Sequence, residues 1–119
     1  MSDQNKAGVK HDKGKLKPRL VMQDMALALQ AVSAVATFGA NKYTEGGWLT
    51  VPHAQDRYTD ALYRHLLANS TDSIHDHESG LLHLAHAAWN ALAVLELELR
   101  EGTCLMRGCN STFDEDSGE

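Results

Sequence analysis

The hydrophobic positions of this chain recur at helical spacing in three stretches, which predict helices over residues 21–38, 53–69 and 79–100. Asp24 is the expected N-cap of the first helix, and Gly39 is expected to end it. The pattern shows little sign of strands. The expected fold class is therefore all-α.

The end of the third predicted helix is apolar over most of its circumference. Residues 91–99 read Ala-Leu-Ala-Val-Leu-Glu-Leu-Glu-Leu, and Gly102 is the expected stop. A three-helix unit of this size would leave that surface exposed unless it pairs. We therefore expect a homodimer or homotetramer whose subunits complete a helical bundle.

The 119 residues suffice for one domain, and composition divides them into three parts. Residues 1–18 are rich in Lys and Gly and form an expected basic arm, residues 19–102 form the helical domain, and residues 103–119 end in an acidic tail expected to be disordered. With no export signal in view, Cys104 and Cys109 are expected to be reduced thiols.

Charge is unevenly distributed along the chain. The net charge is −5, but the first 20 residues carry +4 and the rest carries −9. An acidic body argues against a nucleic-acid polymer as partner, whereas a basic arm on such a body suits a small phosphorylated ligand. No apolar run approaches the ~20 residues of a membrane span, so a cytoplasmic protein without a membrane partner is expected.

Residues 76–90 are the richest in candidate chemistry. Asp76 and Glu78 stand before the third predicted helix, and His83, His86 and Asn90 fall on one face of it, at i, i+3 and i+7. These histidines are either hydrogen-bonded core residues or part of a site that binds metal or phosphate. Carboxylates are the ligands that Mg²⁺ prefers, whereas imidazoles suit a softer ion such as Mn²⁺.

The second predicted helix and the basic arm carry further candidates. Asp60 and Arg64, four residues apart, form either a solvated charge ladder or part of a site facing the third helix, with His65 beside them. The short loop that follows favours an antiparallel neighbour. The arm is either merely solubilising or a phosphate-binding segment, and it lacks the Walker pattern of a P-loop. Its basic candidates are Lys10, Lys13, Lys15 and Arg19.

The dyad His75-Asp76 raises a different possibility, an HD-type metal phosphohydrolase. Such a site needs an upstream histidine, which His65 could provide, and a later aspartate. The only later aspartates, Asp114 and Asp116, lie in the acidic tail.

Four blocks in order resemble a known family. They are residues 8–15 (GVKHDKGK), 35–43 (VATFGANKY) with Trp48, 57–65 (RYTDALYRH) and 76–90 (DHESGLLHLAHAAWN). Together they resemble the phage dATP/dGTP diphosphohydrolases, which are MazG-like all-α nucleotide pyrophosphohydrolases. The resemblance covers roughly residues 8–97.

The resemblance implies hydrolysis of dGTP and dATP between the α and β phosphates, with Mg²⁺ or Mn²⁺ as cofactor, in two or more ions. It implies a MazG-like bundle completed by oligomerisation. In phages that replace adenine with 2-aminoadenine, such an enzyme supplies dGMP for the modified base. The alternatives are an HD-type dNTP triphosphohydrolase and a non-catalytic helical interaction module.

On this resemblance each candidate residue receives an expected role. The catalytic residues are expected to be Asp60, Glu78 and His83. The metal ligands are drawn from Asp60, His65, Asp76, Glu78, His83 and His86. The phosphates are expected to meet Lys10, Lys13, Lys15, Arg19 and Arg64, and the base and sugar to meet Phe38, Gly39, Lys42, Tyr43, Trp48 and Asn90.

One departure from the MazG pattern affects these roles. MazG-type enzymes carry Glu-x-x-Glu on one helix and Glu-x-x-Asp on the next, whereas here histidines partly replace the acids. The identity of the ligands and the number of metal ions therefore stay open.

Overall fold

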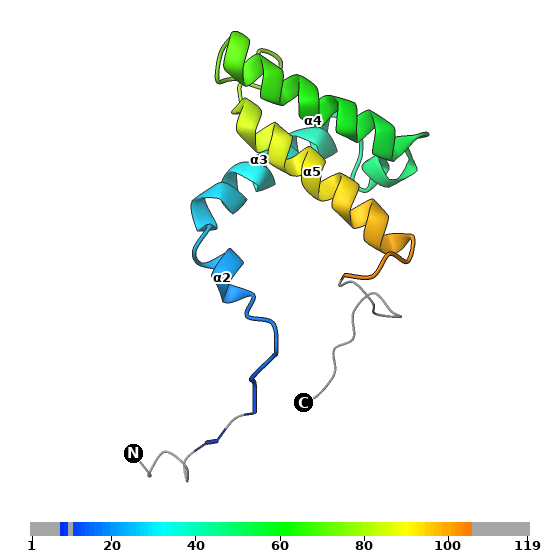
Figure 1. The fold of residues 1–119 in the computed structure, drawn as a ribbon. Coiled ribbons are helices and arrows are strands. Elements are labelled where there is room, and N and C mark those ends of the chain that lie inside the picture. The colour runs from blue at the N-terminus through cyan, green and yellow to red at the C-terminus, as the bar shows by residue number, and fades with distance from the viewer. Residues whose placement is uncertain (1–7, 10, 106–119) are drawn as a thin grey trace.

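The computed structural model describes residues 8–9 and 11–105, and its regular structure is helical (Figure 1). The elements in order are α2 (Arg19–Met22), α3 (Ala26–Lys42), the 3₁₀ helix η1 (Gly47–Thr50), α4 (Ala54–Thr71) and α5 (His83–Arg100). Over the described ranges the only β pairing is an isolated bridge between His75 and Leu82. The all-α prediction is confirmed.

Helices α4 and α5 run antiparallel side by side, and α3 crosses close to the first half of α5 (Figure 1). The buried apolar residues are small: Val35 of α3 and Ala85, Ala87 and Ala93 of α5. Alanines allow close approach of helix backbones but remove little apolar area from water. The core is therefore modest, and it is shared with three buried polar residues of α5.

The first predicted helix differs from the structure at both ends. The chain bends at residues 23–25, so Asp24 lies in the bend and α3 begins from Met25 without a side-chain cap. Gly39 does not end the helix. It lacks the positive φ of a C′ glycine, and its carbonyl accepts a hydrogen bond from the backbone N–H of Tyr43 (2.9 Å). The extra turn carries Lys42, whose side chain forms an ion pair with Glu78.

The third predicted helix begins four residues late, at His83 instead of Ser79. The acidic segment before it folds into a turn, in which Gly80 has a φ of 75° and its N–H donates to the carbonyl of Asp76 (2.8 Å). The other boundaries agree well. The second helix was predicted to within two residues, and Gly102, with a φ of 101°, follows the end of α5 as a C′ glycine.

An aromatic cluster joins η1 to the helix pair. The Trp89 ring meets Trp48 edge-on at 5.6 Å and Tyr58 edge-on at 5.5 Å, measured between ring centroids. The Tyr58 hydroxyl donates a hydrogen bond to the carbonyl of Trp48 (2.6 Å). The turn that delivers Trp48 depends on Gly46, whose φ is 75°. Gly46 thus allows Trp48 to pack in the aromatic cluster.

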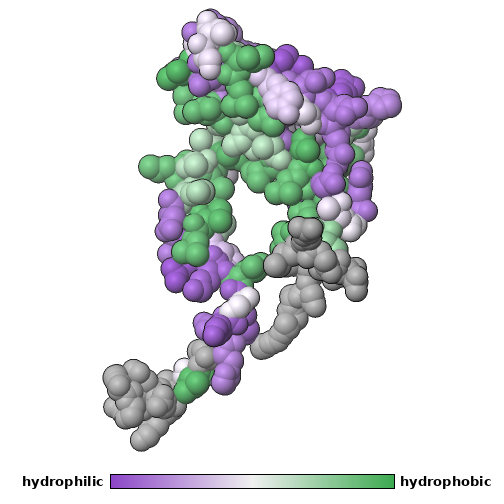
Figure 2. Space-filling model, in the orientation of Figure 1, coloured by the Kyte–Doolittle hydropathy of each residue, from purple (hydrophilic) through white to green (hydrophobic). Residues whose placement is uncertain are grey.

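Many large apolar side chains lie at the surface. Figure 2 shows such residues gathered over α3 and α5, and they include Leu27, Leu84, Leu92 and Leu95, of which Leu27 is 83% exposed. An apolar surface of this kind is consistent with subunit pairing, which stays a prediction. Within the described part of the chain, no helix is both long and apolar enough to cross a membrane.

Candidate metal and nucleotide site

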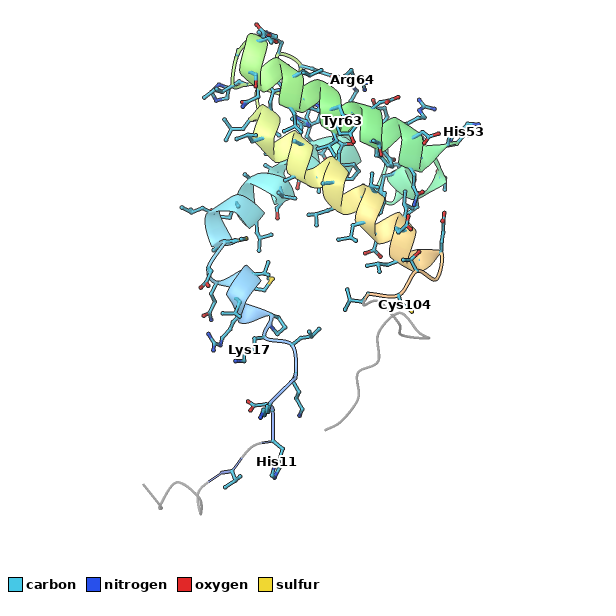
Figure 3. All side chains as sticks on the ribbon, in the orientation of Figure 1. His11, Lys17, His53, Tyr63, Arg64 and Cys104 are labelled. Carbon is cyan, nitrogen blue, oxygen red and sulfur yellow. The ribbon has the colours of Figure 1, made fainter. Side chains whose placement is uncertain are left out.

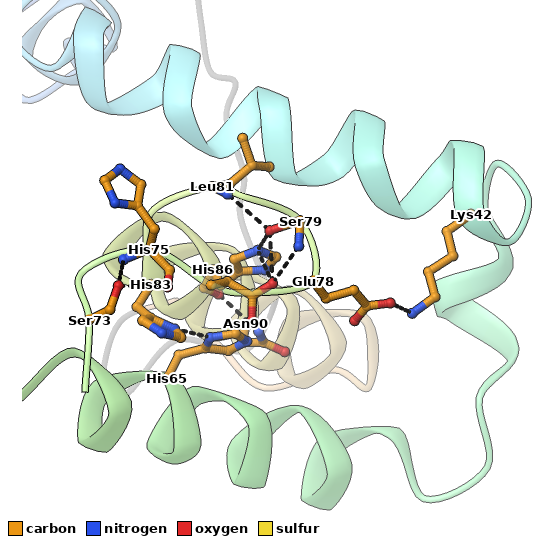
Figure 4. A network of polar contacts seen from close by, with 11 residues as sticks. Lys42, His65, Ser73, His75, Glu78, Ser79, Leu81, His83, His86 and Asn90 are labelled. Atoms are coloured by element: carbon orange, nitrogen blue, oxygen red, sulfur yellow. Dashed lines mark hydrogen bonds and ion pairs between the residues drawn. The ribbon is translucent and has the colours of Figure 1, made fainter. Parts of the chain in front are cut away.

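Three histidines and one aspartate come together where α4, α5 and the loop between them meet (Figure 4). His65 comes from α4, His83 and His86 from the first turns of α5, and Asp76 from the loop. One ligand atom each from His65, Asp76 and His83 lie within 4.8 Å of one another. Of the predicted metal ligands, these are the ones that tertiary folding brings together.

The loop holds Asp76 through a local turn. Its Oδ2 accepts hydrogen bonds from the backbone N–H of Ser79 (2.8 Å) and from the Ser79 hydroxyl (2.9 Å). Two donors on one carboxylate oxygen orient the group and favour its ionised form. An aspartate that accepts a hydrogen bond from a backbone N–H three residues later is a local pattern, and the role of Ser79 could have been predicted from the spacing Asp-x-x-Ser before Gly80.

Ser79 is a residue that sequence reasoning missed. Its Oγ lies 2.7 Å from Nε2 of His86 and accepts a hydrogen bond from the backbone N–H of Leu81 (3.1 Å). When the hydroxyl proton is donated to Asp76, Nε2 of His86 must be the donor to Oγ, because a serine hydroxyl has only one proton. Asp76, Ser79 and His86 therefore form a short hydrogen-bonded chain.

The three imidazoles pack directly on each other. The rings of His65 and His86 stack at 4.5 Å with an interplanar angle of 7°, and the Nδ1 atoms of His65 and His83 lie 2.9 Å apart. One of these two Nδ1 atoms must be protonated and donate to the other. His83 is buried, and its Nε2 has no hydrogen-bond partner among the described residues.

Burial and neighbouring groups shift the pKa of three side chains in this cluster. Burial lowers the pKa of His65 and of His86, and the nearby Asp76 carboxylate opposes this effect only in part. Burial would raise the pKa of Asp76, but the two hydrogen bonds from Ser79 and the neighbouring His86 outweigh it, so this pKa is lowered. Neutral imidazoles beside a carboxylate are the forms in which these groups bind cations.

These shifts predict how the stability of the metal-free chain depends on pH. The pKa values of His65 and His86 are lowered on folding, so below their ordinary value of 6.5 the unfolded chain binds more protons than the folded chain. The free energy of unfolding should therefore fall as the pH drops from about 7 to about 5. Urea unfolding at several pH values measures this. Equal free energies of unfolding at about pH 7 and about pH 5 would contradict the prediction.

Glu78, predicted as a catalytic residue and metal ligand, lies at the edge of the cluster. Its carboxylate is exposed and forms an ion pair with Nζ of Lys42 at the end of α3 (Figure 4). Nζ of Lys42 also lies 5.0 Å from the ring centroid of the exposed Tyr43. Phe38 meets His86 edge-on at 6.4 Å. Of the predicted base and sugar residues of α3, Phe38 thus contacts the histidines, and Lys42 contacts Glu78 at the edge of the cluster.

Other predicted site residues lie elsewhere. Asp60 and Arg64 are exposed on α4, and none of the described polar contacts joins them to the cluster. Trp48 lies in the aromatic cluster with Tyr58 and Trp89. Asn90 is buried one turn after His86. Its side-chain amide donates a hydrogen bond to the backbone carbonyl of His86 (2.9 Å), so this amide is bonded within α5.

The basic arm does not approach the histidines in this structure. Lys13, Lys15 and Arg19 are exposed, and Figure 3 shows the arm, marked by His11 and Lys17, extending away from α4 and α5. Lys10 lies outside the described residues. Its part in a phosphate site, like that of the other arm residues, stays a prediction.

The HD arrangement is not assembled in the described part of the chain. His75 is exposed, and Figure 4 shows its ring pointing away from the cluster. Asp114, Asp116 and Cys109 lie outside the described residues. The acidic tail and any pairing of Cys104 with Cys109 therefore stay at the level of prediction.

Comparison with known proteins agrees with the sequence resemblance. A family model described as "dATP/dGTP diphosphohydrolase, N-terminal" matches residues 5–106. The chain belongs to this family. A protein from Salmonella phage PMBT28, named dATP/dGTP diphosphohydrolase, is 35% identical over 81 residues, which make up 68% of this chain and 26% of that protein. The chain thus spans about a quarter of the length of this curated relative. No solved structure matches the chain.

The family match places the histidine cluster within the matched region. All four residues that meet there, His65, Asp76, His83 and His86, lie within residues 5–106, as do Glu78 and Lys42. The first seven residues and most of the acidic tail are outside the described part. The candidate site therefore lies within the part of the chain that the family model matches.

Proposed function

We propose that this chain carries the metal and nucleotide site of a phage dATP/dGTP diphosphohydrolase and hydrolyses dGTP and dATP to the monophosphate and pyrophosphate. The observation that carries the proposal is the meeting of His65, Asp76 and His83 within 4.8 Å, at a place bordered by Lys42 and aromatic side chains. The name of the relative supports the choice of substrate and reaction.

The cluster has properties that fit a bound divalent metal ion. It offers imidazole nitrogens and a carboxylate, and the buried Nε2 of His83 has no partner in the described residues. When bound, a divalent ion supplies charge neutralisation for the phosphates and lowers the pKa of a bound water. His65, Asp76 and His83 would hold it.

The remaining roles fall to residues around the cluster. In the reaction, the oxygen of a water molecule forms a bond to one phosphorus, the bond from phosphorus to the bridging oxygen breaks, and pyrophosphate leaves. Lys42, a cation beside the cluster, is placed to meet a phosphate oxygen if it exchanges Glu78 for the substrate. Phe38 and Tyr43 offer rings on which a purine could stack.

Product analysis tests the proposed reaction. The chain is incubated with dGTP and with dATP in the presence of Mn²⁺ or Mg²⁺, and the products are separated by anion-exchange chromatography. We expect dGMP or dAMP with pyrophosphate, and no turnover after chelation of the metal. Deoxynucleoside plus triphosphate would favour an HD-type reaction, and dGDP plus phosphate would exclude the proposed bond. No turnover of any nucleotide would favour a non-catalytic helical module.

The proposed biological setting follows from the substrate. An enzyme that removes dATP and produces dGMP would act on the nucleotide pool in the cytoplasm of an infected host. In a phage with 2-aminoadenine in its genome, dGMP is the starting point for the modified base. The rates of hydrolysis of dGTP and dATP in the same assay show which of the two substrates is preferred.

A further inference from the structure

We propose that His65, Asp76 and His83 bind one divalent transition-metal ion of the class that prefers imidazole nitrogen, and that Mg²⁺ is not the ion of this trio. Binding of the ion stands on the geometry of the chain, whereas its part in nucleotide hydrolysis rests on the proposed function. Neither the family description nor the name of the relative assigns a metal to these residues.

The distances suit a common ion. Ligand atoms bound to one ion at about 2.1 Å lie up to about 4.2 Å apart. The three candidate atoms lie within 4.8 Å of one another, so small side-chain rotations would bring them onto one ion. The ligands come from α4, α5 and the loop between them, and such an ion would link all three segments.

The histidines have nitrogens that gain from coordination. The two Nδ1 atoms of His65 and His83 face each other at 2.9 Å, so one donates its proton and the other accepts it, and a cation could take the place of that proton between them. The other ring nitrogen of His83 is buried and has no partner in the described part of the chain. A buried polar atom without a partner is unfavourable, so either nitrogen of His83 would be stabilised by a cation.

The Asp76 carboxylate is also held in an orientation that suits a bound cation. Both hydrogen bonds from Ser79 go to Oδ2 of Asp76, so none of the hydrogen bonds among the described residues occupies Oδ1, which could bind a cation. Ser79 is itself held by the N–H of Leu81 and by Nε2 of His86. Hydrogen bonds of this kind behind a ligand fix its orientation and raise metal affinity. Ser79 and His86 are therefore positioning residues for Asp76.

The donor set selects the class of ion. Two imidazole nitrogens with one carboxylate oxygen suit Mn²⁺, Fe²⁺, Co²⁺, Ni²⁺ or Zn²⁺, and leave positions for water or phosphate oxygens. Mg²⁺ requires octahedral oxygen coordination. The acids that could supply more oxygen lie elsewhere, since Glu78 pairs with Lys42 and Asp60 is exposed on α4.

Co²⁺ titration of the untagged, chelator-treated chain tests the inference by visible absorption, independently of enzyme activity. We expect one ion per chain, a spectrum typical of nitrogen ligation, and no displacement by a large excess of Mg²⁺. His65→Gln and His83→Gln should each weaken Co²⁺ binding at least about 10-fold. His77→Gln is the matched control, because His77 is exposed and pairs with Asp72 outside the cluster.

The possible outcomes separate the two proposals. Displacement of Co²⁺ by Mg²⁺ at similar concentrations, or an unchanged spectrum in His65→Gln, would overturn the metal assignment. Far-UV circular dichroism shows whether each variant folds. If the variant of the buried His83 does not fold, the variant of the half-buried His65 still tests the metal assignment. Co²⁺ binding without any nucleotide hydrolysis would overturn only the proposed function, whereas hydrolysis with Mg²⁺ and no Co²⁺ site would overturn only the metal assignment.

Discussion

Replacing Asp76 with asparagine is expected to lower the rate of dGTP hydrolysis at least about 100-fold while preserving the fold. The amide oxygen can still accept hydrogen bonds from Ser79, so the turn before α5 should persist. The negative charge is lost, and with it the only carboxylate that lies within 4.8 Å of the ligand atoms of His65 and His83 among the described residues. The measurement is the kcat for dGTP with Mn²⁺.

Asp72→Asn is the matched control for this experiment. It makes the same chemical change four residues earlier, at an exposed aspartate that pairs with His77. It should retain nearly the full kcat. Equal losses in the two variants, or full activity of Asp76→Asn, would remove Asp76 from the site. Melting curves of both variants separate loss of activity from loss of structure.

The second large effect concerns stability. Trp89→Ala should lower the free energy of unfolding by about 3 kcal/mol, because the indole fills the space between η1, α4 and α5. Its removal takes the edge-on contacts from Trp48 and Tyr58 and leaves a cavity in a core made mostly of alanine. Urea unfolding followed by circular dichroism gives the value, provided that the slope with urea is unchanged.

Tyr63→Ala provides the comparison for an aromatic residue outside the cluster. Tyr63 lies on α4 and is 57% exposed, so its removal should change the free energy of unfolding by about 0.5 kcal/mol or less. Similar effects of the two substitutions would show that the aromatic cluster does not hold η1 to the helix pair. A concentration-dependent effect of Tyr63→Ala would instead show that this face of α4 contacts a second copy.

Helix α4 illustrates why the site could be predicted only in part. Its bounds were predicted to within two residues, because apolar spacing along one segment is a local property. The sequence names both Asp60 and His65 as candidates but does not say which of them faces α5, because they are five residues apart and so point about 140° away from each other around the helix. Packing against α5 turns His65 inward and leaves Asp60 exposed.

The loop before α5 shows the opposite case, because its contacts depend on a local pattern that the sequence contains. Glu78 stood out as a carboxylate next to a helix, but it faces Lys42 at the surface. The helical pattern does not mark Ser79 as a site residue, yet its hydroxyl joins Asp76 to His86. The turn holds Ser79 beside Asp76, because the N–H and the hydroxyl of Ser79 both donate to the same carboxylate oxygen.

The sequence by itself determined the helical class, the three principal helices and the polar stripe of α5, because each depends on the spacing of residues within one segment. The resemblance of its four blocks also pointed to the family that the comparisons confirm. Only the tertiary structure decided which acid joins the histidines, where Trp48 packs and how far the arm lies from the cluster. These depend on the rotation and approach of separate segments, which no single stretch of sequence encodes.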